Sequence, residues 1–135
     1  MFINTDNIMI GKIFQNSLKG DALFCWDDPC LRSSSGGVIL NFDGKYIRSG
    51  RSVLGPKIFN WDGENLREGG SALAEVLNHF KNGRLMEGKA ETGKVLFHFD
   101  GKLLLEGDYS SGSVSLRLEG EVPLPISALI ATGNI

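Results

Sequence analysis

The sequence predicts a mainly β domain built of successive antiparallel hairpins. Eighteen glycines stand against four prolines, and short apolar runs lie between the glycines. A pattern of an aromatic residue followed by Asp-Gly or Asn-Gly recurs at a constant spacing of nineteen residues. Such a composition and spacing are typical of many short strands joined by tight turns.

The repeat keeps its register through the middle of the chain. Four units follow one another without a gap and begin at Val38, Lys57, Val76 and Val95. A further unit from Val114 keeps an acidic-Gly pair, while the units from Met1 and Ala22 have altered spacing. We therefore predict about seven degenerate units of ~19 residues, forming a single hairpin-repeat domain over residues 1–135.

Each clear unit has the form of a β-hairpin. Five residues with an apolar bias lead into a dipeptide that tolerates positive φ, as two-residue hairpin turns require. The predicted turn residues are Asp43-Gly44, Asp62-Gly63, Asn82-Gly83 and Asp100-Gly101. Calcium binding is the alternative role for these aspartates, but a calcium loop needs several oxygen ligands and each unit supplies one.

The third unit supports two interpretations. Ser71 followed by ALAEVLNHFKNG also reads as a capped helix over residues 72–81, with Leu73, Val76 and Phe80 on one face. Against the helix, Ser52-Val53-Leu54 aligns with Ser71-Ala72-Leu73, as expected for repeats of common ancestry. The sequence leaves helix and strand open here.

Two families have similar motifs. HFKNGRLMEG and HFDGKLLLEG resemble the core of MORN-type repeats, and the wider set of short hairpins resembles the small four-fold β-flower proteins. The resemblance implies an architecture of consecutive hairpins that serves as a scaffold or binding surface. It supplies no catalytic motif.

Alignment of the units produces a column of residues that precede the turns. It reads Thr5, Trp26, Phe42, Trp61, Phe80, Phe99 and Leu118. Aromatic rings on one face of successive hairpins are expected to form the core, because each buries about 150–250 Å². A sugar-binding module that uses these rings as an exposed platform is the alternative.

The position before that column is polar throughout. It reads Asn4, Cys25, Asn41, Asn60, His79, His98 and Arg117. The plain interpretation is the solvent face of each first strand, since antiparallel strands commonly have one wet face. As a candidate binding stripe we take Asn41, Asn60, His79, His98 and Arg117. Two histidines do not make up the three protein ligands of catalytic zinc, so we expect no metal and no cofactor.

A row of arginines occupies the second strands. Arg32, Arg48 and Arg67 are the candidates for an anion clamp, because guanidinium groups match carboxylate and phosphate geometry. The plain alternative is pairing with Glu64, Glu68 or the turn aspartates, which contributes only about 0.2–1 kcal/mol per exposed pair.

Composition narrows the function classes. The net charge of −2, from 14 basic and 16 acidic residues, argues against nucleic-acid binding. No apolar run approaches the roughly 20 residues of a membrane span, and MFINTDN lacks the features of a secretion signal, so we expect a cytoplasmic protein. Cys25 and Cys30 flank WDDP, a spacing that could bring them opposite each other across a hairpin loop. In a cytoplasmic protein, two isolated cysteines are usually reduced.

We therefore expect a non-catalytic binding or interaction module, such as an inhibitor, an immunity-type protein or an assembly protein. The alternative is a small hydrolase-like enzyme that uses His79 or His98 with Cys25 or a carboxylate. At the C-terminus, Pro123 and Pro125 suit an edge strand. The uncharged residues Ile126, Leu129 and Ile130 follow, so we expect self-association through this segment.

Overall fold

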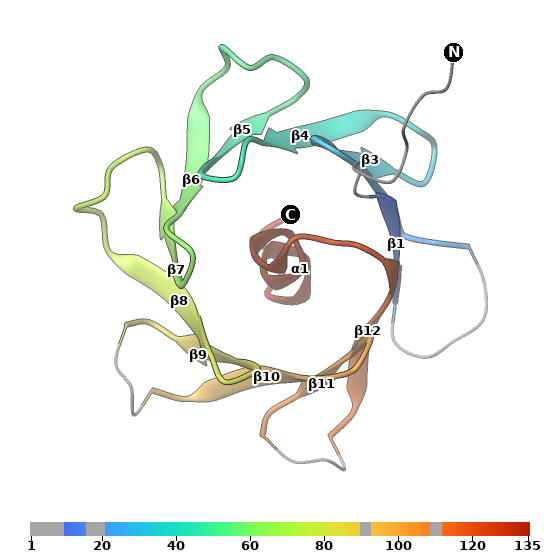
Figure 1. Ribbon diagram of the computed structural model, residues 1–135, viewed down its shortest axis with the longest axis vertical. Coiled ribbons are helices and arrows are strands. Elements are labelled where there is room, and N and C mark those ends of the chain that lie inside the picture. Colours follow the sequence, from blue (N-terminus) through green and yellow to red (C-terminus); the bar gives the residue numbers. More distant parts are fainter. Residues whose placement is uncertain (1–9, 16–20, 90–92, 109–111) are drawn as a thin grey trace, which may run out of the picture.

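The computed structural model describes residues 10–15, 21–89, 93–108 and 112–135. These residues form a closed barrel of antiparallel strands that surrounds one helix (Figure 1). The elements are β1 (Ile10–Gln15), β2 (Phe24–Asp27), β3 (Cys30–Ser33), β4 (Val38–Phe42), β5 (Tyr46–Ser49), β6 (Lys57–Trp61), β7 (Asn65–Glu68), β8 (Val76–Lys81), β9 (Arg84–Glu87), β10 (Val95–Asp100), β11 (Leu103–Glu106), β12 (Val114–Gly120) and α1 (Leu124–Ala131).

Neighbouring strands in the sequence are neighbours in the barrel, and the two ends of the sheet meet. Strands β2 to β11 form five successive hairpins, and β1 pairs with β12 to close the ring, with Ile13 opposite Leu118. The hairpin architecture is confirmed. The number of structural units in the described part of the chain is six rather than seven, because the first and last sequence units share the pair β1/β12. Asn4 and Thr5 lie outside the described residues.

The segment 72–81 is not a helix. Residues 71–74 form a turn, and β8 begins at Val76. Strand β8 pairs with β7 and β9, so that Asn78 lies opposite Leu66 on one side and Glu87 on the other. The helical interpretation was wrong because these two neighbours complete the backbone hydrogen bonds of an extended segment, a gain that depends on residues outside the window.

Of the four predicted turn dipeptides, Asn82-Gly83 occupies the two central positions of its turn, whereas the other three are shifted by one residue. At Asn82-Gly83 both residues have positive φ, 53° and 76°, as in a two-residue type I′ turn. In the unit that begins at Val38, the Asp43 N–H donates to the Tyr46 carbonyl, so the central residues are Gly44 and Lys45. The aspartate therefore flanks the turn instead of occupying its centre.

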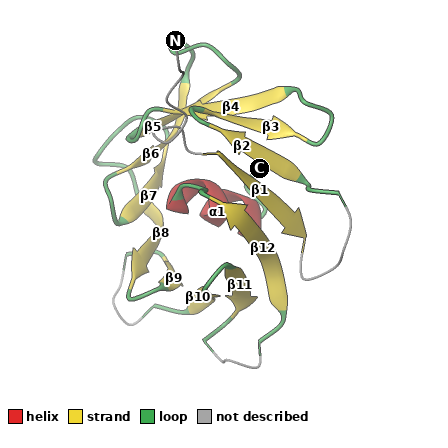
Figure 2. Ribbon diagram, turned by 45° about the vertical axis from the view of Figure 1, so that its right-hand side comes forward, coloured by secondary structure: helices red, strands yellow, loops and turns green. Residues whose placement is uncertain are grey.

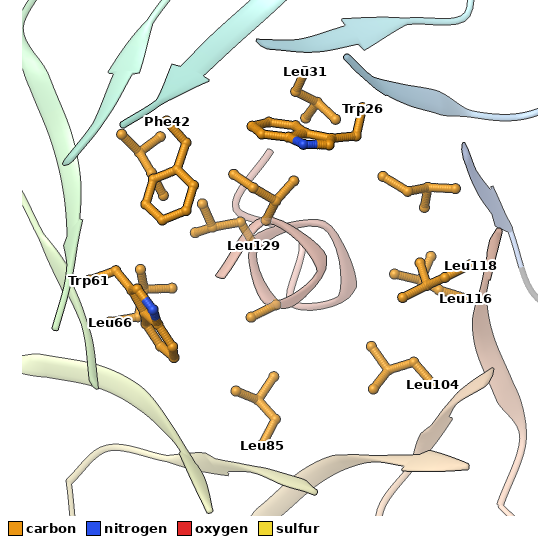
Figure 3. Packing of buried hydrophobic residues seen from close by; sticks show 14 of the residues in the cluster. Trp26, Leu31, Phe42, Trp61, Leu66, Leu85, Leu104, Leu116, Leu118 and Leu129 are labelled. Carbon is orange, nitrogen blue, oxygen red and sulfur yellow. The ribbon is translucent and has the colours of Figure 1, made fainter. Parts of the chain in front are cut away.

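The core lies between the strands and the central helix. Most of the column before the turns is confirmed as core: Trp26 is fully buried, and Phe42, Trp61 and Phe80 are at most 9% exposed (Figure 3). Phe99 is partly buried and packs against this core. The second strands add one fully buried aliphatic residue each: Ile13, Leu31, Ile47, Leu66, Leu85 and Leu104. From the centre, α1 contributes Ile126, Ala128 and Leu129, all with no exposed area.

The expected C-terminal edge strand is instead this central helix (Figure 2). Pro123 directly precedes α1 and Pro125 lies in its first turn, where the missing N–H has no helical partner to lose. The edge-strand interpretation was wrong because the closed barrel has no sheet edge for this segment to cover. Self-association stays a prediction, but Ile126 and Leu129 are buried and not available to it.

Candidate functional site

The polar column does not form the solvent face of the strands. Asn41, Asn60 and His79 are only 2%, 4% and 2% exposed. The alternation rule failed here because the connections that leave the second strands fold back over these side chains. We call these connections the outer loops, and Figure 1 shows that those at residues 50–56 and 69–75 project away from the barrel axis.

The two asparagines fasten the outer loops to the barrel. Asn41 donates from Nδ2 to the carbonyl oxygens of Gly50, at 2.8 Å, and Ser52, at 3.1 Å. Asn60 makes the equivalent bonds to Gly69, at 2.9 Å, and Ser71, at 3.2 Å. Their amide groups are therefore committed to loop structure.

The two histidines also fasten outer loops to the barrel, with one hydrogen bond each. Nδ1 of His79 lies 2.6 Å from the Gly88 carbonyl, and Nδ1 of His98 lies 2.6 Å from the Gly107 carbonyl. Because a carbonyl only accepts, Nδ1 carries the proton in both rings. Nε2 of His79 is buried and has no partner among the described residues.

The arginine row pairs with the turn aspartates, as the plain interpretation predicted. Arg48 contacts Asp43 at 2.9 Å, Arg67 contacts Asp62 at 2.8 Å, and Arg32 contacts Asp27 at 3.3 Å. The Arg48 and Arg67 side chains are only 13% and 15% exposed, so they are poorly placed to form an open anion clamp.

Two of these pairs also affect the pKa of their aspartates, Asp43 and Asp62. Partial burial by itself would raise the pKa of Asp43, but hydrogen bonds from the Tyr46 and Lys45 amides and from Arg48 outweigh it. The net effect lowers the pKa of Asp43 from 3.8 to about 2. For Asp62 the same opposition between burial and donors, with Arg67 foremost among the donors, also lowers the pKa well below its usual value.

The remaining candidates do not join a common site. Arg117 pairs with Glu119 and lies over the Phe14 ring, 4.0 Å from its centroid. Cys25 lies opposite Arg32 and Cys30 opposite Asp27, so the two cysteines do not face each other, and both are free thiols.

The fold separates one residue pair of the enzyme alternative, Cys25 and His79. Strand β2, which carries Cys25, and strand β8, which carries His79, lie six places apart in the ring of twelve, on opposite sides of the barrel. Nor are the aromatic rings of the core available as a sugar platform, because Trp26, Phe42 and Trp61 are buried. Within the described ranges, no three His, Cys, Asp or Glu side chains are placed to hold a metal ion.

The most unusual surface feature lies on the outer loops. Leu54 is 92% exposed and Leu73 is 96% exposed, the highest values among the exposed large hydrophobic residues that the structure describes. They occupy equivalent positions in the outer loops 50–56 and 69–75, which are adjacent in the ring. Val53, next to Leu54, is 66% exposed. Two neighbouring loops therefore present apolar side chains to solvent.

Both loops hold their leucine in the same way. The Leu54 amide donates to Ser52 Oγ at 3.1 Å, and the Leu73 amide donates to Ser71 Oγ at 3.1 Å. The carbonyls of Ser52 and Ser71 accept the N–H groups of Gly55 and Ala74, each at 3.2 Å. With the bonds from Asn41 and Asn60, these contacts give both loops a defined conformation that ends in an exposed leucine.

A shallow hollow lies beside the second of these loops. Arg67, Leu73, Val76 and Lys89 contribute to its lining. It combines apolar surface with two basic side chains and the acidic side chain of Glu75, and it lies between the outer loop 69–75 and the start of the next one. The sequence analysis did not identify these leucines as candidate binding residues. The signal was the alignment of the Ser-x-Leu triplets 52–54 and 71–73, because a leucine that recurs in a loop does not belong to the core.

The arrangement of six two-stranded units around a central helix defines a radial, petal-like β-hairpin protein. A family model described as the 6-fold beta flower protein matches residues 13–127. The chain belongs to this 6-fold beta flower family, which confirms the β-flower resemblance and corrects its symmetry from four to six. Comparison with curated proteins and with solved structures finds no significant match.

Among the described residues, no helix combines the length and apolar character needed to cross a membrane.

Proposed function

We propose that this chain is a non-catalytic interaction module that binds a protein partner through Leu54 and Leu73. The carrying observation is that two adjacent, identically hydrogen-bonded loops expose these leucines almost completely. An exposed leucine on a mobile chain is common, but ordering a loop costs conformational entropy. A loop ordered around an exposed apolar side chain is suited to recognition, because little further ordering is needed on binding.

The hydrogen-bond network supports this proposal. Asn41 and Asn60 are positioning residues that set the path of the loops from inside the barrel. Their replacement would change the loops without removing any surface that a partner touches. Asn41 and Asn60, which were candidates for direct binding, thus support the proposed surface by holding its loops in place.

The proposed setting is the cytoplasm, where the free thiols of Cys25 and Cys30 would persist in reduced form. An inhibitor, an immunity-type protein and an assembly protein all use such a surface. The nature of the captured partner distinguishes them: an enzyme inhibited in proportion to occupancy indicates the first two, and a structural subunit the third.

The test is quantitative co-purification from the source cell with wild-type chain and the double variant Leu54→Ser/Leu73→Ser. Because both side chains are exposed, the double variant should keep its free energy of unfolding within about 0.5 kcal/mol per site. It should lose the proteins that wild type retains. Ile10→Ser is the control, since Ile10 is 54% exposed but lies on β1, outside the outer loops. Equal recovery with wild type and the double variant would refute the proposal.

A further inference from the structure

The ring of Tyr46 is surrounded by positive charge. Lys57 Nζ lies 3.9 Å from the ring centroid, Lys45 Nζ lies 5.2 Å from it, and the Arg48 guanidinium carbon lies 5.4 Å from it. We call Lys45, Tyr46, Arg48 and Lys57 the Tyr46 cluster. It lies on β5, the turn before it and the first residue of β6, at the base of the outer loop that carries Leu54.

The charge of this cluster is only partly compensated. Arg48 is paired with Asp43 at 2.9 Å. Neither Lys45 nor Lys57 has a carboxylate partner among the residues that the structure describes, and both side chains are exposed. Two positive charges around one half-buried ring are therefore left without an opposite charge.

Comparison among the hairpins shows that this arrangement is particular to one place in the ring. Of the six units, four begin their first strand with valine, at Val38, Val76, Val95 and Val114, one begins it with Phe24, and one with Lys57. In the sheet, Lys57 lies directly opposite Arg48, whereas Arg32 lies opposite Val38 and Arg67 opposite Val76. Like charges directly opposite each other on neighbouring strands destabilise a sheet.

A valine would therefore fit the fold at position 57, and the lysine creates an unfavourable pair instead. The aromatic ring offsets part of that cost, because a cation is attracted to the face of a tyrosine ring. An anion held between Lys45 and Lys57 would offset the rest. Positive charge beside an exposed leucine is the surface that an acidic segment with an apolar residue would complement.

We propose that the Tyr46 cluster binds a carboxylate group in an acidic segment of the protein partner. This inference rests on the proposed function, because the acidic segment belongs to the same protein partner that binds Leu54 and Leu73. The carboxylate lies between the ammonium groups of Lys45 and Lys57, with Tyr46 as the platform that positions the Lys57 side chain. The leucines make apolar contacts with the partner, and the positive charge of the Tyr46 cluster favours partners that have an acidic residue at this position.

The experiment uses the full chain and a hexaglutamate peptide, followed by amide chemical shifts in NMR at low salt. The peptide has no apolar side chain, so its binding does not depend on Leu54 or Leu73, and a failure here is distinguishable from a failure of the leucine surface. We expect saturable shifts centred on Tyr46, Arg48 and Lys57. Added salt should weaken them, because exposed charge pairs are screened.

Two variants make the assignment specific. Lys57→Val introduces the valine that begins the first strand of four other units, so it should fold, and it should weaken hexaglutamate binding about threefold to fivefold, the upper range for one exposed charge pair. Lys94→Val removes an exposed charge next to β10, on another part of the ring, and should leave the affinity unchanged. Absence of saturation, or equal weakening by both variants, would overturn the proposal.

A titration with inorganic phosphate completes the test. If phosphate saturates the shifts of the same amides and hexaglutamate binds no tighter than phosphate, the cluster is a small-anion site and the acidic-segment assignment is wrong.

Discussion

Asp62 links a turn, an ion pair and a shifted acidity in a single side chain. Its Oδ1 accepts the N–H groups of Glu64, at 2.9 Å, and Asn65, at 2.7 Å, while Oδ2 accepts from Arg67 at 2.8 Å. Because the folded pKa is lowered, the ionised side chain stabilises the fold fully above its ordinary pKa of 3.8. That contribution is lost as the pH falls below this value.

Asp62→Asn tests this account. The amide oxygen of Asn can still accept from the two backbone N–H groups, but the charge opposite Arg67 is lost. We expect the variant to be less stable by about 0.2–1 kcal/mol at pH 7, because the Asp62 side chain is 41% exposed and solvent screens the pair. The difference should be smaller at pH 2 than at pH 7, because the contribution of the charge begins to be lost below pH 3.8. Urea denaturation at both pH values measures it, and a pH-independent difference would show that geometry rather than charge causes the loss.

The roles of Asn60 and His79 show where residue-level prediction stops. The column itself was visible in the sequence, and strand alternation correctly separated it from the aromatic core. Its burial was not predictable, because it depends on outer loops that fold back over it. Asn and His exchange at this position because both offer an N–H to the carbonyl of a glycine with positive φ, Gly69 at 75° and Gly88 at 64°.

At the scale of elements, the barrel depends on the contact between β1 and β12. Gly11 and Gly120 lie opposite each other at this seam. A Cβ on Gly120 would lie 2.3 Å from the Ile10 carbonyl oxygen, and one on Gly11 would lie 2.4 Å from the Glu121 carbonyl oxygen. The two backbones approach so closely that only glycine fits on either side.

Gly120→Ala should therefore open the seam. Gly63→Ala is the matched control, because Gly63 also has positive φ, 101°, but a Cβ there would meet no atom within 4 Å beyond its chain neighbours. The control should cost about 1–2 kcal/mol for its left-handed backbone. Gly120→Ala should cost about 1–3 kcal/mol more, because of the clash. Equal losses in thermal denaturation would mean that the seam adapts to a methyl group.

Helix α1 is the element that sequence reasoning missed, for a physical reason. A helix in the centre of a barrel is surrounded by apolar side chains, so its own sequence, LPISALIA, is apolar except for the buried Ser127 and has no polar face. Without that periodicity, the two prolines suggested an edge strand. The same absence of a tertiary partner made 72–81 ambiguous, since the strands that pair with β8 lie outside that window.

On the scale of the whole molecule, α1 joins the hairpins to one another. Adjacent hairpins share backbone hydrogen bonds, but hairpins on opposite sides of the ring meet only through the core around this helix (Figure 3). Leu129 has no exposed area and lies among the side chains directed inward from the ring. We therefore expect the helix to couple the six two-stranded units into a single cooperative structure.

Leu129→Ala measures this coupling. The substitution should lower the free energy of unfolding by about 2–5 kcal/mol, because it removes buried atoms and leaves a cavity in the centre. If the barrel unfolds as one unit, the most protected amides of every hairpin should lose hydrogen-exchange protection by that same free energy. Ile10→Ser, at an exposed position of β1, should leave this protection nearly unchanged. Loss confined to the hairpins nearest Leu129 would mean that the units open independently and that β-sheet closure, rather than the helix, holds the ring together.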